Sequence, residues 1–126
     1  MEPTLLTYSL MPPVQLLVES LCRNLGIRCV PVPPEKQGLS LGALLGLLPE
    51  QPGGKAVPGA MLIMAFFDGK LLNDFLEAYR AMGIPPISHK AMLTLTNTVW
   101  TGEALYENIS REMAAVRQSG KKKQEG

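Results

Sequence analysis

The chain is poor in the residues from which most recognisable sites are built. Its 126 residues include one histidine, one tryptophan and two cysteines, and only 18% of them are charged. No G-x-S-x-G, P-loop, G-x-G-x-x-G or H-E-x-x-H pattern occurs in it. The sequence therefore predicts no known catalytic constellation, no cofactor and no metal site, and it favours a non-enzymatic role.

The sequence also shows no long apolar run and no pattern typical of a secretory signal. The longest apolar stretch, residues 39–48, has about ten residues and contains Gly42 and Gly46, so it is too short to cross a bilayer. Residues 1–10 carry no basic region typical of a secretory signal. We therefore expect a cytoplasmic protein that does not enter a membrane.

The two cysteines, Cys22 and Cys29, have neither C-x-x-C nor zinc-site spacing. Cys22 falls late in a predicted helix and Cys29 falls in the predicted strand that follows. We expect both to be buried, reduced thiols rather than a structural disulfide.

Clustered positive charge is confined to the end of the chain. Residues 119–126 contain Lys121, Lys122 and Lys123 and one acid, Glu125, and nine basic and ten acidic residues remain without them. Nucleic-acid binding is therefore the least favoured role, because such proteins usually carry a basic face. We expect one domain over residues 1–118, followed by a disordered lysine-rich tail over 119–126.

What the chain does contain is an alternation of apolar patterns. Four runs read as strands, at residues 4–10, 27–32, 60–67 and 90–96, and a helical pattern follows each run. The order β-α-β-α-β-α-β-α predicts an α/β domain with a small, mostly parallel four-stranded sheet and helices on its faces. We recognise no internal repeat beyond this alternation.

Local signals place the strands and bound the helices. Pro31 favours an edge position for the second strand, and the continuous apolar run 60–67 favours a central one, which predicts the strand order 2-1-3-4. The helices are expected to begin near Pro13, Ser40, Asp68 and Thr101, and Gly26 and Gly83 are expected to end the first and third of them.

Ligands of open parallel sheets bind beyond the carboxyl ends of the strands, where the strand order reverses. If all neighbouring strands are parallel, this point lies between strands one and three, at residues 9–13 and 67–70. Strand four adds polar residues at the same edge. The candidate ligand-binding residues are Lys90, Thr94, Thr96, Asn97, Trp100, Thr101 and Asp68.

Each candidate residue also has a structural explanation. Asp68 and Thr101 can cap helices, Asn97 can stabilise a turn, and Trp100 can close one end of the core. His89 has no carboxylate or cysteine near it in the sequence, so we expect a solvated loop residue rather than a base or a ligand.

The second half of the chain carries two recognisable patterns. One is L-x-x-F-L-x-x-x-R-x-x-G-I, which starts at Leu72, and the other is K-A-x-L-T-x-T-N-x-x-W-T, which starts at Lys90. Residues 60–113 thereby resemble a small bacterial family known only as a domain of unknown function. Leu95 stands where that pattern would have a proline between the threonines. The resemblance implies no activity.

Two roles of different class remain. The first is a non-enzymatic binding or regulatory module that engages a protein partner or a second copy of itself. It would use the edge formed by residues 90–101 or the apolar helix at residues 39–48. The alternative is a small-anion-binding domain or enzyme at the edge beyond strand four, with Lys90, Thr94, Thr96 and Asn97 around the anion.

Overall fold

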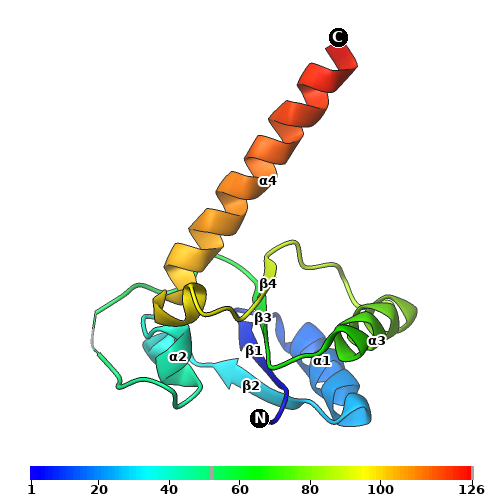
Figure 1. Ribbon diagram of the computed structural model, residues 1–126. Helices are drawn as coiled ribbons and strands as arrows, with labels where there is room; N and C mark the ends of the chain where they lie inside the picture. The colour runs from blue at the N-terminus through cyan, green and yellow to red at the C-terminus, as the bar shows by residue number, and fades with distance from the viewer. Residues whose placement is uncertain (52, 126) are drawn as a thin grey trace.

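The computed structural model describes residues 1–51 and 53–125, and its centre is a four-stranded sheet with helices on both faces (Figure 1). The strands are β1 (Thr4–Tyr8), β2 (Arg28–Val32), β3 (Met61–Ala65) and β4 (Lys90–Met92), in the order β2-β1-β3-β4. The helices are α1 (Pro12–Leu25), α2 (Leu41–Leu44), α3 (Gly69–Ala81) and α4 (Gly102–Glu125), with short 3-10 turns η1 (Pro34–Lys36) and η2 (Asn97–Val99). The predicted α/β fold, the mostly parallel sheet and the strand order are confirmed.

The two central strands carry the core on both of their faces. Every residue of β1 and of β3 is buried, as expected for strands covered on both sides. Successive side chains point to opposite faces, so Leu5 and Leu62 pack against α1 and α3, whereas Leu6 and Ile63 pack against α2 and α4. The sheet therefore separates two apolar clusters.

One expectation about the sheet is wrong, because β1 and β3 run antiparallel. Thr4 pairs with Ala65 and Tyr8 pairs with Met61, while β1–β2 and β3–β4 are parallel. The ends of β1 and β3 therefore point to opposite edges of the sheet. The pocket expected between residues 9–13 and residues 67–70 cannot form there.

The segment between β2 and β3 explains this orientation. A parallel return would have to cross a face of the sheet, and a five-residue strand is about 16 Å long. Among the described residues of this segment α2 is the only α-helix, and its four residues span about 6 Å, too little for the helical crossing that parallel neighbours usually have. The chain therefore enters β3 from the same edge at which it leaves β2.

The antiparallel centre makes the sheet a repeat of two strand–helix–strand units, which the sequence analysis did not recognise. Thr4, Ser9, Pro12 and Gly26 of the first unit correspond to Met61, Phe66, Gly69 and Gly83 of the second, each numbered 57 higher. The pairing of β1 with β3 is centred on Leu6 and Ile63, as a two-fold axis through the sheet requires. Both crossover helices, α1 and α3, pack in the same apolar cluster (Figure 1).

Several elements differ in length from the sequence prediction. β4 ends at Met92 rather than near Thr96, because residues 94–97 form a turn. The last helix, α4, extends away from the sheet and continues to Glu125, so it includes most of the segment 119–126 (Figure 1). The disorder expected of that segment stays a prediction, and Gly126 lies outside the described residues. Among the described helices, none has both the length and the apolar character needed to cross a membrane.

Candidate functional site

The residues predicted to bind a ligand do not converge on one pocket. Thr94, Thr96 and Asn97 follow the carboxyl end of β4, and Asp68 follows that of β3, so these four lie toward one edge of the sheet. Lys90 stands at the opposite end of β4 and faces the α3 side. The candidate residues therefore belong to separate local groups.

Asn97 holds the turn after β4 together. Its side-chain oxygen accepts from the Thr94 N–H at 2.8 Å, and its amide nitrogen donates to the Met92 carbonyl at 3.0 Å. Its own N–H donates to the Thr94 hydroxyl at 3.1 Å. Asn97 is buried, whereas Thr94, Leu95 and Thr96 are exposed. The polar atoms of this turn thus bind one another, which fixes the turn and holds Leu95 out in solvent.

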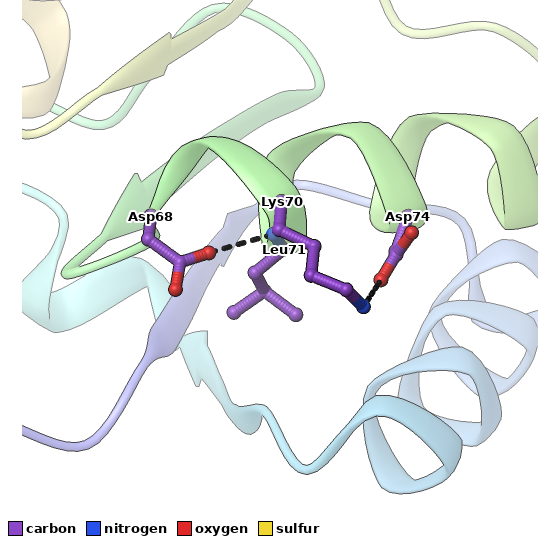
Figure 2. Close-up of polar contacts among 4 residues, drawn as sticks. All are labelled: Asp68, Lys70, Leu71 and Asp74. Atoms are coloured by element: carbon purple, nitrogen blue, oxygen red, sulfur yellow. Dashed lines mark hydrogen bonds and ion pairs between the residues drawn. The ribbon is translucent and has the colours of Figure 1, made fainter.

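Asp68 caps helix α3, as the sequence predicts. One carboxylate oxygen accepts from the Leu71 N–H at 2.7 Å, and Figure 2 shows the Lys70 side chain running in the other direction, to Asp74. The Lys70–Asp74 ion pair has an N–O distance of 3.0 Å, and the hydrogen bond to Asp74 raises the pKa of Lys70. The carboxylate satisfies an N–H at the helix terminus, where an anionic ligand would otherwise bind.

Thr101 and Trp100 join η2 to α4 and α2. The Thr101 hydroxyl accepts from the Ala104 N–H at 3.2 Å, which confirms the predicted cap of the last helix. The Trp100 carbonyl accepts from the Leu41 N–H at 2.9 Å, and its side chain packs against the apolar cluster under α2 and α4. Both residues therefore anchor the polar turn to the core.

The apolar helix and the turn after β4, two separate predictions from the sequence, meet on one surface. We call it the α2–η2 surface and define it by Leu48 and Val99, which line one hollow, together with Leu47 and Leu95, which are exposed apolar residues close to them in the chain. Leu95 is 98% exposed and Val99 is 66% exposed. Gly42 lets the two segments approach, because a Cβ there would lie 2.6 Å from Leu48 and 2.8 Å from Thr98.

A hollow of about 320 Å³ adjoins this surface. Leu48 and Val99 line it from the two sides, and Ser40 and Thr101 contribute hydroxyl groups. The other lining residues are Gly38, Pro49, Gln51 and Gly53, so none of the eight is charged. The hollow can therefore accept apolar groups and neutral hydrogen-bonding groups.

Lys90 belongs to a second, more apolar cavity, which lies between α3 and β4 and has a volume of about 260 Å³. Arg80 lines the same cavity. The remaining walls come from apolar and aromatic side chains, namely Leu62, Phe75, Leu76, Tyr79, Pro86 and Ile87. Sequence reasoning identified Lys90 but missed the cavity, because the walls come from segments that only the fold brings together.

His89 is not the solvated loop residue that the sequence predicts. Its ring is half-buried and stacks on Tyr106 of α4, with ring centroids 3.7 Å apart and an angle of 3° between the planes. Its Nε2 atom is hydrogen-bonded to the Ser110 hydroxyl at 2.8 Å. Burial lowers the pKa of His89, so the neutral ring predominates at neutral pH. His89 thus ties the loop before β4 to α4.

The described residues contain no group of three or more His, Cys, Asp and Glu side chains that could hold a metal ion. Asp68 caps α3 and Asp74 pairs with Lys70, whereas Glu19 and Glu112 accept hydrogen bonds from amide side chains one turn earlier in their helices. What the described residues offer chemically is apolar surface with a few polar groups, which suits ligands with apolar bodies and neutral hydrogen-bonding groups.

Comparison with known protein families finds a match in the second strand–helix–strand unit and the segment that follows it. Residues 60–116 match the model of a family described as "Domain of unknown function (DUF3783)". Searches of curated proteins and of solved structures found no match. The matched segment runs from just before β3 into α4 and includes the turn held by Asn97. This part of the chain is therefore similar to a domain family whose function is unknown.

Proposed function

We propose that the protein is a non-enzymatic binding module that takes an uncharged, apolar segment of a protein partner on its α2–η2 surface. The observation that carries the proposal is that this surface exposes four large apolar side chains from two segments distant in the sequence. Single exposed apolar residues are common in proteins, but exposed apolar residues from two segments that meet at one hollow are typical of an interaction site.

The turn that carries Leu95 supports this function because it is held before any partner arrives. Three hydrogen bonds of Asn97 fix the turn, so Leu95 loses little conformational freedom when it is buried. The described residues that line the neighbouring hollow are all uncharged, and interface centres are depleted of charge. An apolar peptide segment with neutral polar groups matches both properties.

A peptide-display selection on the intact protein tests the proposal. We expect selected peptides to contain apolar side chains without charges, and we expect Leu95→Ser with Val99→Ser to abolish their binding. Val116→Ser is the matched control, because Val116 is 71% exposed and stands about 20 Å along α4 from the first residue of that helix. Failure to select such peptides, or binding that survives the double substitution, would overturn the proposal.

Self-association is the competing use of the same surface. Sedimentation of the wild-type protein over a wide concentration range measures it directly. A dimer that disappears in the Leu95→Ser, Val99→Ser variant would replace the partner segment by a second copy of the chain. If the protein stays monomeric at all concentrations, self-association is ruled out and the expected partner is a different protein.

A second candidate function rests on Lys90 and Arg80 beside the apolar cavity between α3 and β4. Two cations next to an apolar wall suit a small organic anion that has a carboxylate and a hydrocarbon body. We expect decanoate to bind there, and Arg80→Gln or Lys90→Gln to weaken it roughly tenfold, the effect of losing one charge-assisted hydrogen bond. Lys36→Gln, on η1, is the control with the same loss of charge.

The expected location, partners, domain bounds and origin of the protein are part of the same proposal. A module of this kind would act in the cytoplasm, without nucleic acid, and as one domain over residues 1–118. The motif that begins at Lys90 would be the family's shared feature, in proteins of bacterial origin. In this chain the motif holds the turn after β4 and caps α4, and this structural role supports the proposal that the motif is shared.

A further inference from the structure

Another hollow, of about 290 Å³, lies where the parallel strands β1 and β2 end, and we call it the β1–β2 hollow. Half of its lining is polar and half is apolar, and none of the eight described lining residues is charged. The polar ones are Thr7, Ser9, Gln15 and Gln37, and the apolar ones are Leu10, Pro31, Val32 and Pro34. Because ligands of α/β domains bind beyond the carboxyl ends of parallel strands, this hollow has the position of a ligand site.

Gln37 fixes the inner wall of the β1–β2 hollow. Its side chain is 3% exposed, and its amide nitrogen donates to the Val32 carbonyl and to the Ser9 hydroxyl, both at 3.3 Å. Its amide oxygen accepts from the Val57 N–H at 2.9 Å. These three hydrogen bonds join the ends of β1 and β2 to the segment before β3. The hollow is therefore held in shape before any ligand arrives, which lowers the entropic cost of binding.

Two hydroxyl groups of the hollow keep an unused hydrogen-bonding function. The Thr7 hydroxyl donates to the Gln15 amide oxygen at 2.8 Å, so the Thr7 oxygen can still accept. The Ser9 hydroxyl accepts from Gln37, and its own proton has no acceptor among the described residues. The Gln15 amide nitrogen already donates to Glu19 at 3.0 Å. The hollow thus offers a ligand one hydroxyl acceptor and one hydroxyl donor.

The second strand–helix–strand unit shows that the fold does not require these polar groups. Three of the four polar lining residues have apolar counterparts numbered 57 higher, which are Met64 for Thr7, Phe66 for Ser9 and Leu72 for Gln15. Ser9 and Phe66 even share a left-handed backbone, with φ angles of 57° and 65°. Burying polar side chains is costly, and the other unit builds the same positions from apolar ones. A ligand that uses the polar groups accounts for the difference between the units.

We propose that the β1–β2 hollow binds a small, neutral cyclic amide, a ring in which an N–H group stands beside a carbonyl group. The ligand N–H donates to the Thr7 oxygen, and the ligand carbonyl accepts from the Ser9 hydroxyl. A ring holds both groups on one side, whereas a trans peptide bond directs them in opposite directions. The apolar lining from Leu10, Pro31 and Pro34 suits the faces of the ring, and the uncharged lining suits a neutral molecule.

An NMR titration of the intact protein with uracil, a neutral ring that carries both groups, tests the inference. We expect the backbone amide signals of Ser9, Leu10, Val32 and Gln37 to shift together along one saturation curve. Dimethyluracil with methyl groups in place of both N–H protons should bind about fivefold more weakly, the effect of losing one neutral hydrogen bond. Thymine, whose extra methyl group leaves both N–H groups intact, is the control for size and should bind like uracil.

Two variants locate the binding groups. Ser9→Gly removes the hydroxyl donor without straining the backbone, because glycine adopts a positive φ freely, and Thr7→Val removes the acceptor. Each should weaken uracil binding about fivefold. Ser88→Gly, in the exposed loop before β4, is the matched control and should leave binding unchanged.

The comparison of ligands on the wild-type protein keeps the proposal falsifiable if Thr7→Val or Ser9→Gly fails to fold. Uracil that causes no shifts, or shifts confined to residues outside the β1–β2 hollow, would overturn the inference. So would equal binding of uracil and dimethyluracil, or binding that is undiminished in a folded Ser9→Gly variant.

Discussion

Gly26 and Gly83 end the two crossover helices at equivalent positions and with nearly the same backbone conformation. Their φ angles are 71° and 69°, in the left-handed region that only glycine adopts freely. Each is preceded three residues earlier by an arginine and followed by an isoleucine, in the pattern R-x-x-G-I. These two short matches are the part of the repeat that remains visible in the sequence.

The repeat predicts equal effects of substitution at the two glycines. A Cβ at either position meets no atom within 4 Å, so the cost of alanine comes from the backbone alone. We expect Gly26→Ala and Gly83→Ala each to lower the free energy of unfolding by about 1 kcal/mol in urea denaturation. Gly69→Ala is the control, because Gly69 has equal space and no positive φ. A cost at only one glycine would contradict the equivalence.

Local chemistry explains what the sequence could predict. Asp68, Ser40 and Thr101 cap their helices as expected, since a cap depends on residues only a few positions apart. Strand order was also accessible, because Pro31 and the continuous apolar run of β3 separate edge from centre. These features depend on residues that are close together in the sequence.

Relations across the chain explain what the sequence could not predict. The antiparallel pairing of β1 and β3 depends on how short α2 is, and the leucine pattern suggested a helix that continues to Leu48. The stacking of His89 on Tyr106 joins residues that belong to different elements. The contact between the two predicted interaction segments, α2 and η2, likewise appears only in three dimensions.

The buried tyrosine of β1 gives a prediction of increased stability. The Tyr8 side chain is fully buried, and its hydroxyl has no hydrogen-bond partner among the described residues. Because an unpaired buried hydroxyl is destabilising, we expect Tyr8→Phe to raise the free energy of unfolding by about 1 kcal/mol.

Tyr79 provides the matched control for this substitution. Its hydroxyl donates to the Pro85 carbonyl at 2.6 Å, so Tyr79→Phe removes a hydrogen bond and should lower the free energy of unfolding by about 1 kcal/mol. The two variants delete the same atom and are compared in one denaturation series. A loss of stability in Tyr8→Phe would show that its hydroxyl has a partner after all.

The turn after β4 gives a prediction that separates structural from ligand-binding roles. Asn97→Ala removes two side-chain hydrogen bonds from a buried site, and we expect the free energy of unfolding to fall by about 2 kcal/mol. The neighbouring exposed Thr96 should tolerate alanine within about 0.5 kcal/mol. Unchanged stability in Asn97→Ala would indicate that the Asn97 side chain is available to bind a ligand.

The sole histidine predicts how stability depends on pH. Burial lowers the pKa of His89 in the folded protein below its usual value of about 6.5, which the unfolded chain keeps. The unfolded state therefore binds a proton more readily, and linkage makes acid favour unfolding. The stability gained from the neutral, stacked ring should be complete above about pH 6.5 and should be lost as the pH falls through the folded pKa.

Thermal unfolding between about pH 5 and pH 7.5 measures this contribution, because no other side chain of the chain has an ordinary pKa in that window. We expect the melting temperature of the wild type to fall toward the acid end. His89→Gln should lose most of this dependence, since glutamine cannot be protonated yet can still reach Ser110. An equally steep fall in His89→Gln would show that carboxylates, not the histidine stacked on Tyr106, set the acid stability.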